Sequence, residues 1–169
     1  MRRIRIIRNT AIAEFANVVY TYRDMIYRLW LISPWIGMYT DGTIDPLQLM
    51  VDAIRTKPKC MVNVITREPK SKDHWHINAL TLLRNNIKPT MLYCKTLHTK
   101  LYIAECDSFA CAMLGSPNLT AGGNTANIEL ALEVRDLSLT RHDEVSGMLC
   151  DLVDYAHALL ADEAVVLAP

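Results

Sequence analysis

Residues 98–129 read HTKLYIAECDSFACAMLGSPNLTAGGNTANIE, and this stretch guides the interpretation of the whole chain. Without its apolar residues, a polar skeleton of three short groups remains: His98-x-Lys100, Gly115-Ser116-x-Asn118 and Asn127-x-Glu129. A histidine can attack phosphorus, a lysine and an asparagine can hold phosphate oxygens, and a carboxylate can orient the histidine. Because phosphoryl transfer depends mostly on positioning and charge stabilisation, this set predicts a site for that chemistry.

The spacing within the first group has a structural reason. Alternation in LHTKLYIA predicts a strand, and residues two apart on a strand project from the same face, so His98 and Lys100 would enter one site. A hydrogen bond between the far ring nitrogen and Glu129 or Ser116 would fix the histidine tautomer. Lys100 and Asn118 would hold non-bridging phosphate oxygens. For an isolated pair, a satisfied strand histidine and a solvated lysine would be the better interpretation, but the ordered skeleton favours catalysis.

The ordered skeleton resembles the HKD signature of the phospholipase D superfamily. In that signature, His-x-Lys and four spacer residues lead to an Asp, and Gly-Ser-x-Asn and Asn-x-Glu follow. The departure is at the Asp position, which is Glu105 here, while Asp107 comes two residues too late. As the family's Asp is largely structural, the departure affects fine geometry more than chemistry. The resemblance implies an α/β fold, a mixed β-sheet flanked by helices, with the motif strands near the centre.

The resemblance also implies an activity and an assembly. Superfamily enzymes use two HKD motifs, one histidine forming a phosphohistidine and the other protonating the leaving group. This chain has one motif, so we expect a homodimer that places two copies of His98, Lys100, Asn118 and Glu129 in one shared site. Short single-motif members are mostly nucleases or phosphodiesterases, which favours DNA or RNA as the substrate. No carboxylate cluster suited to Mg²⁺ accompanies the motif, so we expect neither a metal nor another cofactor.

Three further residues are weaker candidates for substrate binding. Trp35 lies in Ser-Pro-Trp-Ile, which is similar to a turn often found near the superfamily's active site, and it would stack on a base or simply pack at the rim. Trp75 lies in REPKSKDHWH, whose basic and aromatic residues suit either a loop that binds single strands or a solvated loop. Asn127 belongs to the Asn-x-Glu group.

Composition sets outer limits on the function. The 169 residues, 51% of them hydrophobic, suit one domain spanning 1–169. Lys plus Arg and Asp plus Glu number 18 each, so no global charge indicates nucleic acid, and no apolar run approaches the roughly 20 residues of a membrane span. We therefore expect no stable membrane insertion. MRRIRIIRNT lacks a signal peptide's apolar region, and the five cysteines form no CxxC pair, so we expect a reducing cytoplasm.

Hydrophobic periodicity predicts the order of the elements. Helices are expected after Thr10 and over about 47–57, 77–86 and 141–162. Strands are expected at 2–8, LWLISP, 60–66, PTMLYC, HTKLYIAE, SFACAML and IELALEV. The arginines of residues 2–8 would either contact phosphates or protect an edge strand from aggregation.

Two other functions remain open. A lipid phosphodiesterase or phosphatidyltransferase would use the same residues, with an exposed apolar entrance or an interfacial helix. A weakened HKD subunit would serve as a binding module in a larger complex, for example in restriction or defence with an ATPase partner, and Glu105 is the support for that interpretation.

Overall fold

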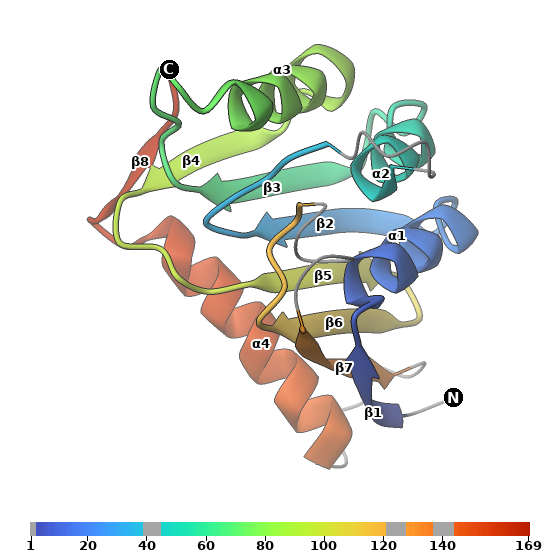
Figure 1. The fold of residues 1–169 in the computed structure, drawn as a ribbon. Helices are drawn as coiled ribbons and strands as arrows, with labels where there is room; N and C mark the ends of the chain where they lie inside the picture. The colour runs from blue at the N-terminus through green and yellow to red at the C-terminus, as the bar shows by residue number, and fades with distance from the viewer. Residues whose placement is uncertain (1–2, 39–44, 121–127, 137–143) are drawn as a thin grey trace.

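The computed structural model describes residues 3–38, 45–120, 128–136 and 144–169. Within them, eight strands form one mixed sheet, and helices lie on both of its faces (Figure 1). The strands are β1 (Arg3–Arg8), β2 (Ile26–Ile32), β3 (Met61–Thr66), β4 (Thr90–Cys94), β5 (Leu101–Cys106), β6 (Ala110–Gly115), β7 (Leu130–Asp136) and β8 (Val165–Leu167). The helices are α1 (Ala11–Thr21), α2 (Pro46–Ile54), α3 (His74–Ile87) and α4 (Glu144–Leu160).

The sheet has the order β1-β7-β6-β5-β2-β3-β4-β8. The pairs β2/β3 and β3/β4 are parallel, with α2 and α3 as their crossovers, and the other pairs are antiparallel. The fold is therefore the predicted mixed α/β sheet, and β5 and β6, which carry the motif, lie in its interior as expected.

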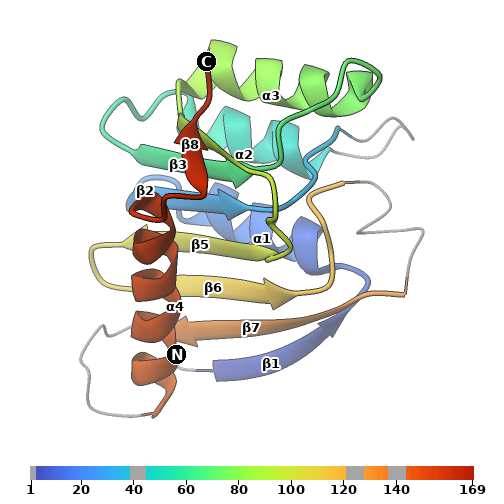
Figure 2. The same cartoon turned by 90° about the vertical axis from the view of Figure 1, so that its left-hand side faces the viewer.

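Strand β2 shows how the sheet builds two cores. Leu29 and Leu31 pack into the core beneath α1, α2 and α3, while Trp30 and Ile32 pack into the core beneath α4. Figure 2 shows α4 alone on its face of the sheet. All four side chains are fully buried, and each such burial stabilises the fold by about 1.5–3 kcal/mol. Two-sided burial explains why β2 reads as a continuous apolar run.

Several element boundaries differ from the sequence-based predictions. Strand β5 begins at Leu101, so His98 and Lys100 precede the strand instead of alternating along it. Helix α3 begins at His74, not at 77, and the Asp73 side chain accepts from the backbone N–H of Lys70 (3.0 Å) in the preceding turn. Strand β8 was not predicted, because a three-residue strand carries little periodic signal. The expected helix over 141–162 is α4, and residues 141–143 lie outside the described part.

Strand β1 is an edge strand, as one of the two interpretations of residues 2–8 held. The guanidinium groups of Arg3 and Arg5 bind the carboxylate of Glu133, with nitrogen–oxygen distances of 2.7 and 2.9 Å. Glu133 is fully buried in β7, so these two arginines join β1 to its neighbour and are not free for phosphates.

None of the four helices in the described residues is long and apolar enough to cross a membrane.

Candidate active site

The polar skeleton gathers at one end of the strands in the interior of the sheet. Strands β5, β6 and β7 are antiparallel neighbours, so the start of β5, the end of β6 and the start of β7 lie side by side. The register pairs Leu101 with Leu114 and Gly115 with Ala131. This arrangement brings together residues 98–100, 116 and 129 from three separate parts of the motif.

His98 and Lys100 meet although neither belongs to a strand. Lys100 Nζ lies 3.5 Å from His98 Nδ1, and the His98 side chain is exposed. Burial lowers the pKa of Lys100, the charge of Glu129 opposes this shift, and the charge of Arg67 adds to it. The lysine therefore lies within the electrostatic influence of both a carboxylate and a guanidinium.

Ser116 and Glu129 form the second half of the site. The Ser116 hydroxyl donates to the Glu129 carboxylate, and the hydroxyl oxygen accepts from the backbone N–H of Leu130 (3.1 Å). Gly115 permits this approach, because a Cβ there would lie 2.3 Å from the Leu130 carbonyl oxygen. In the structure, side-chain hydrogen bonds join Ser116 to Glu129 and His98 to Lys100. Orientation of His98 by a carboxylate therefore stays a prediction.

Asn9 positions Glu129 and was missed in the sequence. Its side-chain oxygen accepts from the backbone N–H of Glu129 (3.0 Å), and its own N–H donates to the Glu129 carbonyl (3.2 Å). Asn9 has φ 59°, a left-handed conformation that asparagine tolerates better than most residues. The signal in the sequence was an asparagine directly after the strand-like run RIRIIR.

Asn118 lies beside the end of β2. Its Oδ1 is 3.5 Å from the hydroxyl of Ser33, which is fully buried and also lies 2.8 Å from the carbonyl oxygen of Trp35. The Ser33 oxygen accepts from the N–H of Leu119 (3.3 Å). Ser33 thus ties the loop that carries Asn118 to the turn that carries Trp35.

A cavity of about 490 Å³ opens at the site. It is lined by residues 98–101 and 114–116, and Leu152 and Tyr155 of α4 supply a partly apolar wall. The Tyr155 hydroxyl lies 2.8 Å from Thr99 Oγ1, so α4 is joined directly to the segment between the candidate nucleophile and the lysine.

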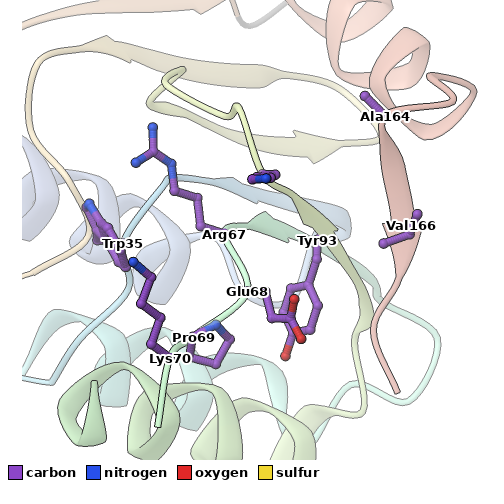
Figure 3. A pocket seen from close by; sticks show the side chains of 9 residues that line it. Trp35, Arg67, Glu68, Pro69, Lys70, Tyr93, Ala164 and Val166 are labelled. Atoms are coloured by element: carbon purple, nitrogen blue, oxygen red, sulfur yellow. The ribbon is translucent and has the colours of Figure 1, made fainter. Parts of the chain in front are cut away.

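Of the three weaker candidates for substrate binding, one lines a cavity, one packs outside its lining, and one lies outside the described residues. Trp35 lines a second cavity beside the site, together with Arg67 (Figure 3). Trp75 is 46% exposed and packs against Trp35 with ring centroids 5.9 Å apart, outside that cavity's lining. Asn127 lies outside the described residues.

Glu105, at the motif's Asp position, lies near the other end of β5, away from the site. Its carboxylate accepts from the Trp30 indole N–H (2.7 Å) and the Tyr27 hydroxyl (3.2 Å), and Arg28 lies 3.7 Å away. Only 6% of Glu105 is exposed. The residue therefore supports β5 structurally and does not enter the site.

The described residues add neither a metal site nor a cysteine to the candidate active site. Among the described residues, no three His, Cys, Asp or Glu side chains are grouped to hold a metal ion. The five cysteines are free thiols, and burial raises the pKa of Cys60 and Cys111 to about 11 and of Cys106 to about 12.

Solved structures show the fold to which this chain is similar. Nuc from Salmonella typhimurium, a phospholipase D family member, matches with a TM-score of 0.68 and 13% identity over 94% of this chain and 93% of its own. NucT from Helicobacter pylori matches with a TM-score of 0.67 and 12% identity over 99% and 100%. Polyphosphate kinase from Porphyromonas gingivalis matches with a TM-score of 0.60 and 11% identity over 94% of this chain but 22% of the kinase.

No family model matches the sequence, and no curated protein matches it. The fold is nevertheless similar to those of Nuc and NucT, in line with the mixed α/β sheet that the motif's resemblance implied. At these identities the likeness concerns the fold.

Proposed function

We propose that this chain is a metal-independent phosphodiesterase, a nuclease that cleaves DNA or RNA through a phosphohistidine on His98. The observation that carries the proposal is the meeting of His98 and Lys100 with the Ser116–Glu129 pair at one edge of a phospholipase D fold. Three separated motif groups converge there through strand register, which a chance His-x-Lys would not require.

Each side chain has a role that follows from its chemistry. The His98 imidazole attacks phosphorus and forms a P–N bond, and the bond to the leaving oxygen breaks as a second imidazole donates a proton to that oxygen. Lys100 and Asn118 hold the non-bridging oxygens while their charge grows. Water then attacks the phosphohistidine, loses a proton to the second imidazole, and releases the phosphate with His98 restored.

We further infer that the second imidazole is His98 of another copy of the chain. The chain has one HKD motif, and exposed apolar residues flank Glu129 in the sequence and occur on the neighbouring strand. Ile128 is 99% exposed and Leu130 is 53% exposed on either side of Glu129, and Ile6 of the neighbouring β1 is 67% exposed. Apolar side chains gathered at a surface are typical of a face that a partner covers.

Hydrolysis in EDTA tests the chemistry. The wild-type protein and His98→Ala would be incubated with bis(p-nitrophenyl) phosphate, single- and double-stranded DNA, RNA and a phospholipid. We expect EDTA-resistant cleavage of the small diester and of nucleic acid, and none in the variant. Metal-dependent cleavage, or cleavage that survives in the variant, would refute the mechanism, and turnover of phospholipid alone would favour the lipid phosphodiesterase.

Mixed dimers test the shared site. Wild-type and His98→Ala chains would be refolded together at known ratios and assayed on the small diester. If each site needs two histidines, activity falls as the square of the wild-type fraction. A linear fall, or full activity in a species that sediments as a monomer, would show that one chain suffices.

The binding-module alternative loses its sequence support. It depended on Glu105 in place of Asp, and the Glu105 carboxylate is fully engaged by Trp30 and Tyr27 away from the site. We therefore expect that glutamate in place of aspartate at position 105 does not affect catalysis.

A further inference from the structure

Figure 3 shows the second cavity, which has a volume of about 630 Å³. Its lining side chains differ in kind from those of the first cavity. Three cations, Arg67, Lys70 and Lys95, line it against one carboxylate, Glu68, and the ring of Trp35 forms part of its wall. The local excess is two positive charges, whereas the whole chain has a net charge of zero. A concave, cationic and partly aromatic site of this size suits a ligand that carries phosphate and a flat ring.

We propose that this cavity binds one unpaired nucleotide of a single-stranded nucleic acid, beside the phosphodiester that His98 attacks. The inference rests on the proposed function and narrows its substrate from DNA or RNA in general to single strands or unpaired ends.

Arg67 connects the cavity to the candidate active site. Its Nε donates to the carbonyl oxygen of Leu97 (2.8 Å), which directly precedes His98. Arg67 also acts on the lysine of the motif, since its charge adds to burial in lowering the pKa of Lys100. Lys95 lies three residues before His98 along the same segment. A strand whose scissile phosphate lies at His98 therefore meets the cavity within its adjoining nucleotide.

Trp35 supplies the flat surface, and its surroundings hold it in place. The Arg67 guanidinium carbon lies 5.7 Å from the Trp35 ring centroid, and the rings of Trp75 and His76 lie 5.9 and 5.6 Å away. His76 is fully buried, and its two ring nitrogens contact the backbone of Ile36 (2.7 Å) and of Arg67 (3.1 Å). The turn carrying Trp35 and the segment carrying Arg67 are thus fixed to each other before any ligand binds.

The geometry selects unpaired bases. In a duplex, both faces of a base are covered by its stacked neighbours, so a base reaches a protein ring only after it leaves the stack. Stacking on an aromatic ring accepts every base, because each has a π-face. The cavity therefore predicts discrimination between single and double strands without a sequence preference.

Binding to the inactive His98→Ala protein tests the role of the lysines. A fluorescein-labelled eight-nucleotide oligothymidylate would be titrated at several salt concentrations. On single strands, each lost phosphate contact lowers the slope of log K against log salt by about 0.7. We expect Lys70→Ala with Lys95→Ala to lower the slope by at least about 0.7 and to weaken binding on the order of tenfold at low salt. Lys59→Ala, a change of an exposed lysine at the opposite edge of the sheet, is the matched control.

Stacking has its own variants and its own signal. We expect Trp35→Ala to weaken binding by about 5- to 150-fold, and Trp35→Phe to recover most of the loss because a flat ring remains. Oligonucleotide binding should quench tryptophan fluorescence, and this quenching should largely disappear in Trp35→Phe. Thermal melting of each variant would show that it is folded.

The outcomes separate this inference from the proposed function. Binding of the lysine and Trp35 variants that equals the Lys59→Ala control would overturn the cavity assignment, and equal losses with a duplex of the same length would overturn the preference for single strands. Hydrolysis of bis(p-nitrophenyl) phosphate reports on the His98 chemistry alone. Cavity-dependent binding without any hydrolysis would support the nucleotide site and refute the phosphodiesterase. Hydrolysis without cavity-dependent binding would support the phosphodiesterase and overturn the cavity assignment.

Discussion

Glu105→Asp is the most informative single change, because it restores the residue that the HKD signature prescribes. A motif-based expectation is that the variant would be more active. The structure predicts a less stable protein with the same activity on a small diester. Glu105 lies at the end of β5 remote from His98, where Trp30 donates to its carboxylate across 2.7 Å.

The magnitude follows from the contacts that would be lost. Aspartate is shorter by one methylene group, so its carboxylate withdraws from the Trp30 indole N–H, and Trp30 has no exposed surface through which water could replace the bond. Loss of a hydrogen bond to a charged group that leaves a buried donor unsatisfied costs about 2–3 kcal/mol. For a protein of this size, that corresponds to a fall in Tm of about 4–12 °C.

Two measurements on the same samples decide the matter. Thermal unfolding would be compared among wild type, Glu105→Asp and Glu163→Asp, which shortens an exposed glutamate near the C-terminus, and hydrolysis of bis(p-nitrophenyl) phosphate would be measured well below every Tm. We expect a lower Tm in Glu105→Asp alone and equal rates in all three. A rise in rate with an unchanged Tm would refute the structural role of Glu105 and revive the weakened-subunit interpretation.

Three other changes probe the site's supports. In Arg67→Gln, loss of the charge that lowers the pKa of Lys100 should move the alkaline limb of the pH–rate profile to higher pH, because the protonated lysine persists further; an unmoved limb would contradict this. Asn9→Ala and Asn9→Gly both lose the side-chain bond to Glu129, but alanine keeps a Cβ at φ 59° and glycine does not, so Asn9→Ala should destabilise by about 1–2 kcal/mol more than Asn9→Gly in denaturant unfolding. Gly115→Ala would set a Cβ 2.3 Å from the β7 backbone, and the forced shift should cost about 1–3 kcal/mol, seen as a lower Tm.

The sequence predicted the sheet class and the helices well where long apolar patterns exist. The run that became β2 supplies residues to both cores, and the amphipathic pattern that became α4 supplies residues to one. Boundaries were less predictable. The polar start of α3 at His74 has no periodic signal, and the three residues of β8 are defined by pairing with β4 across about 70 positions.

The candidate site shows the same contrast between local sequence patterns and contacts that depend on the fold. His98, Lys100, Ser116 and Glu129 could be proposed together because their types and spacings lie within about thirty residues. Asn9 and Ser33 were missed because they act through contacts 120 and 85 residues away in the chain. Arg67 was visible only as one basic residue among several, and its link to Leu97 needed the fold. Local sequence carries the candidate reactive groups, whereas the residues that position them become apparent after the strands pair.

The two ends of β5 explain how the motif tolerates its unusual residue. Pairing of Trp30 with Ile103 sets the register between β2 and β5, and the bond from Trp30 to Glu105 reinforces it at the end remote from the chemistry. The same register sets the height of His98 and Lys100 relative to the end of β2, where Ser33 contacts Asn118. A carboxylate at position 105 therefore stabilises the pairing of β2 with β5 and takes no part in the proposed chemistry. Its length matters for reaching the Trp30 indole, so glutamate suits this position although the HKD signature has aspartate there.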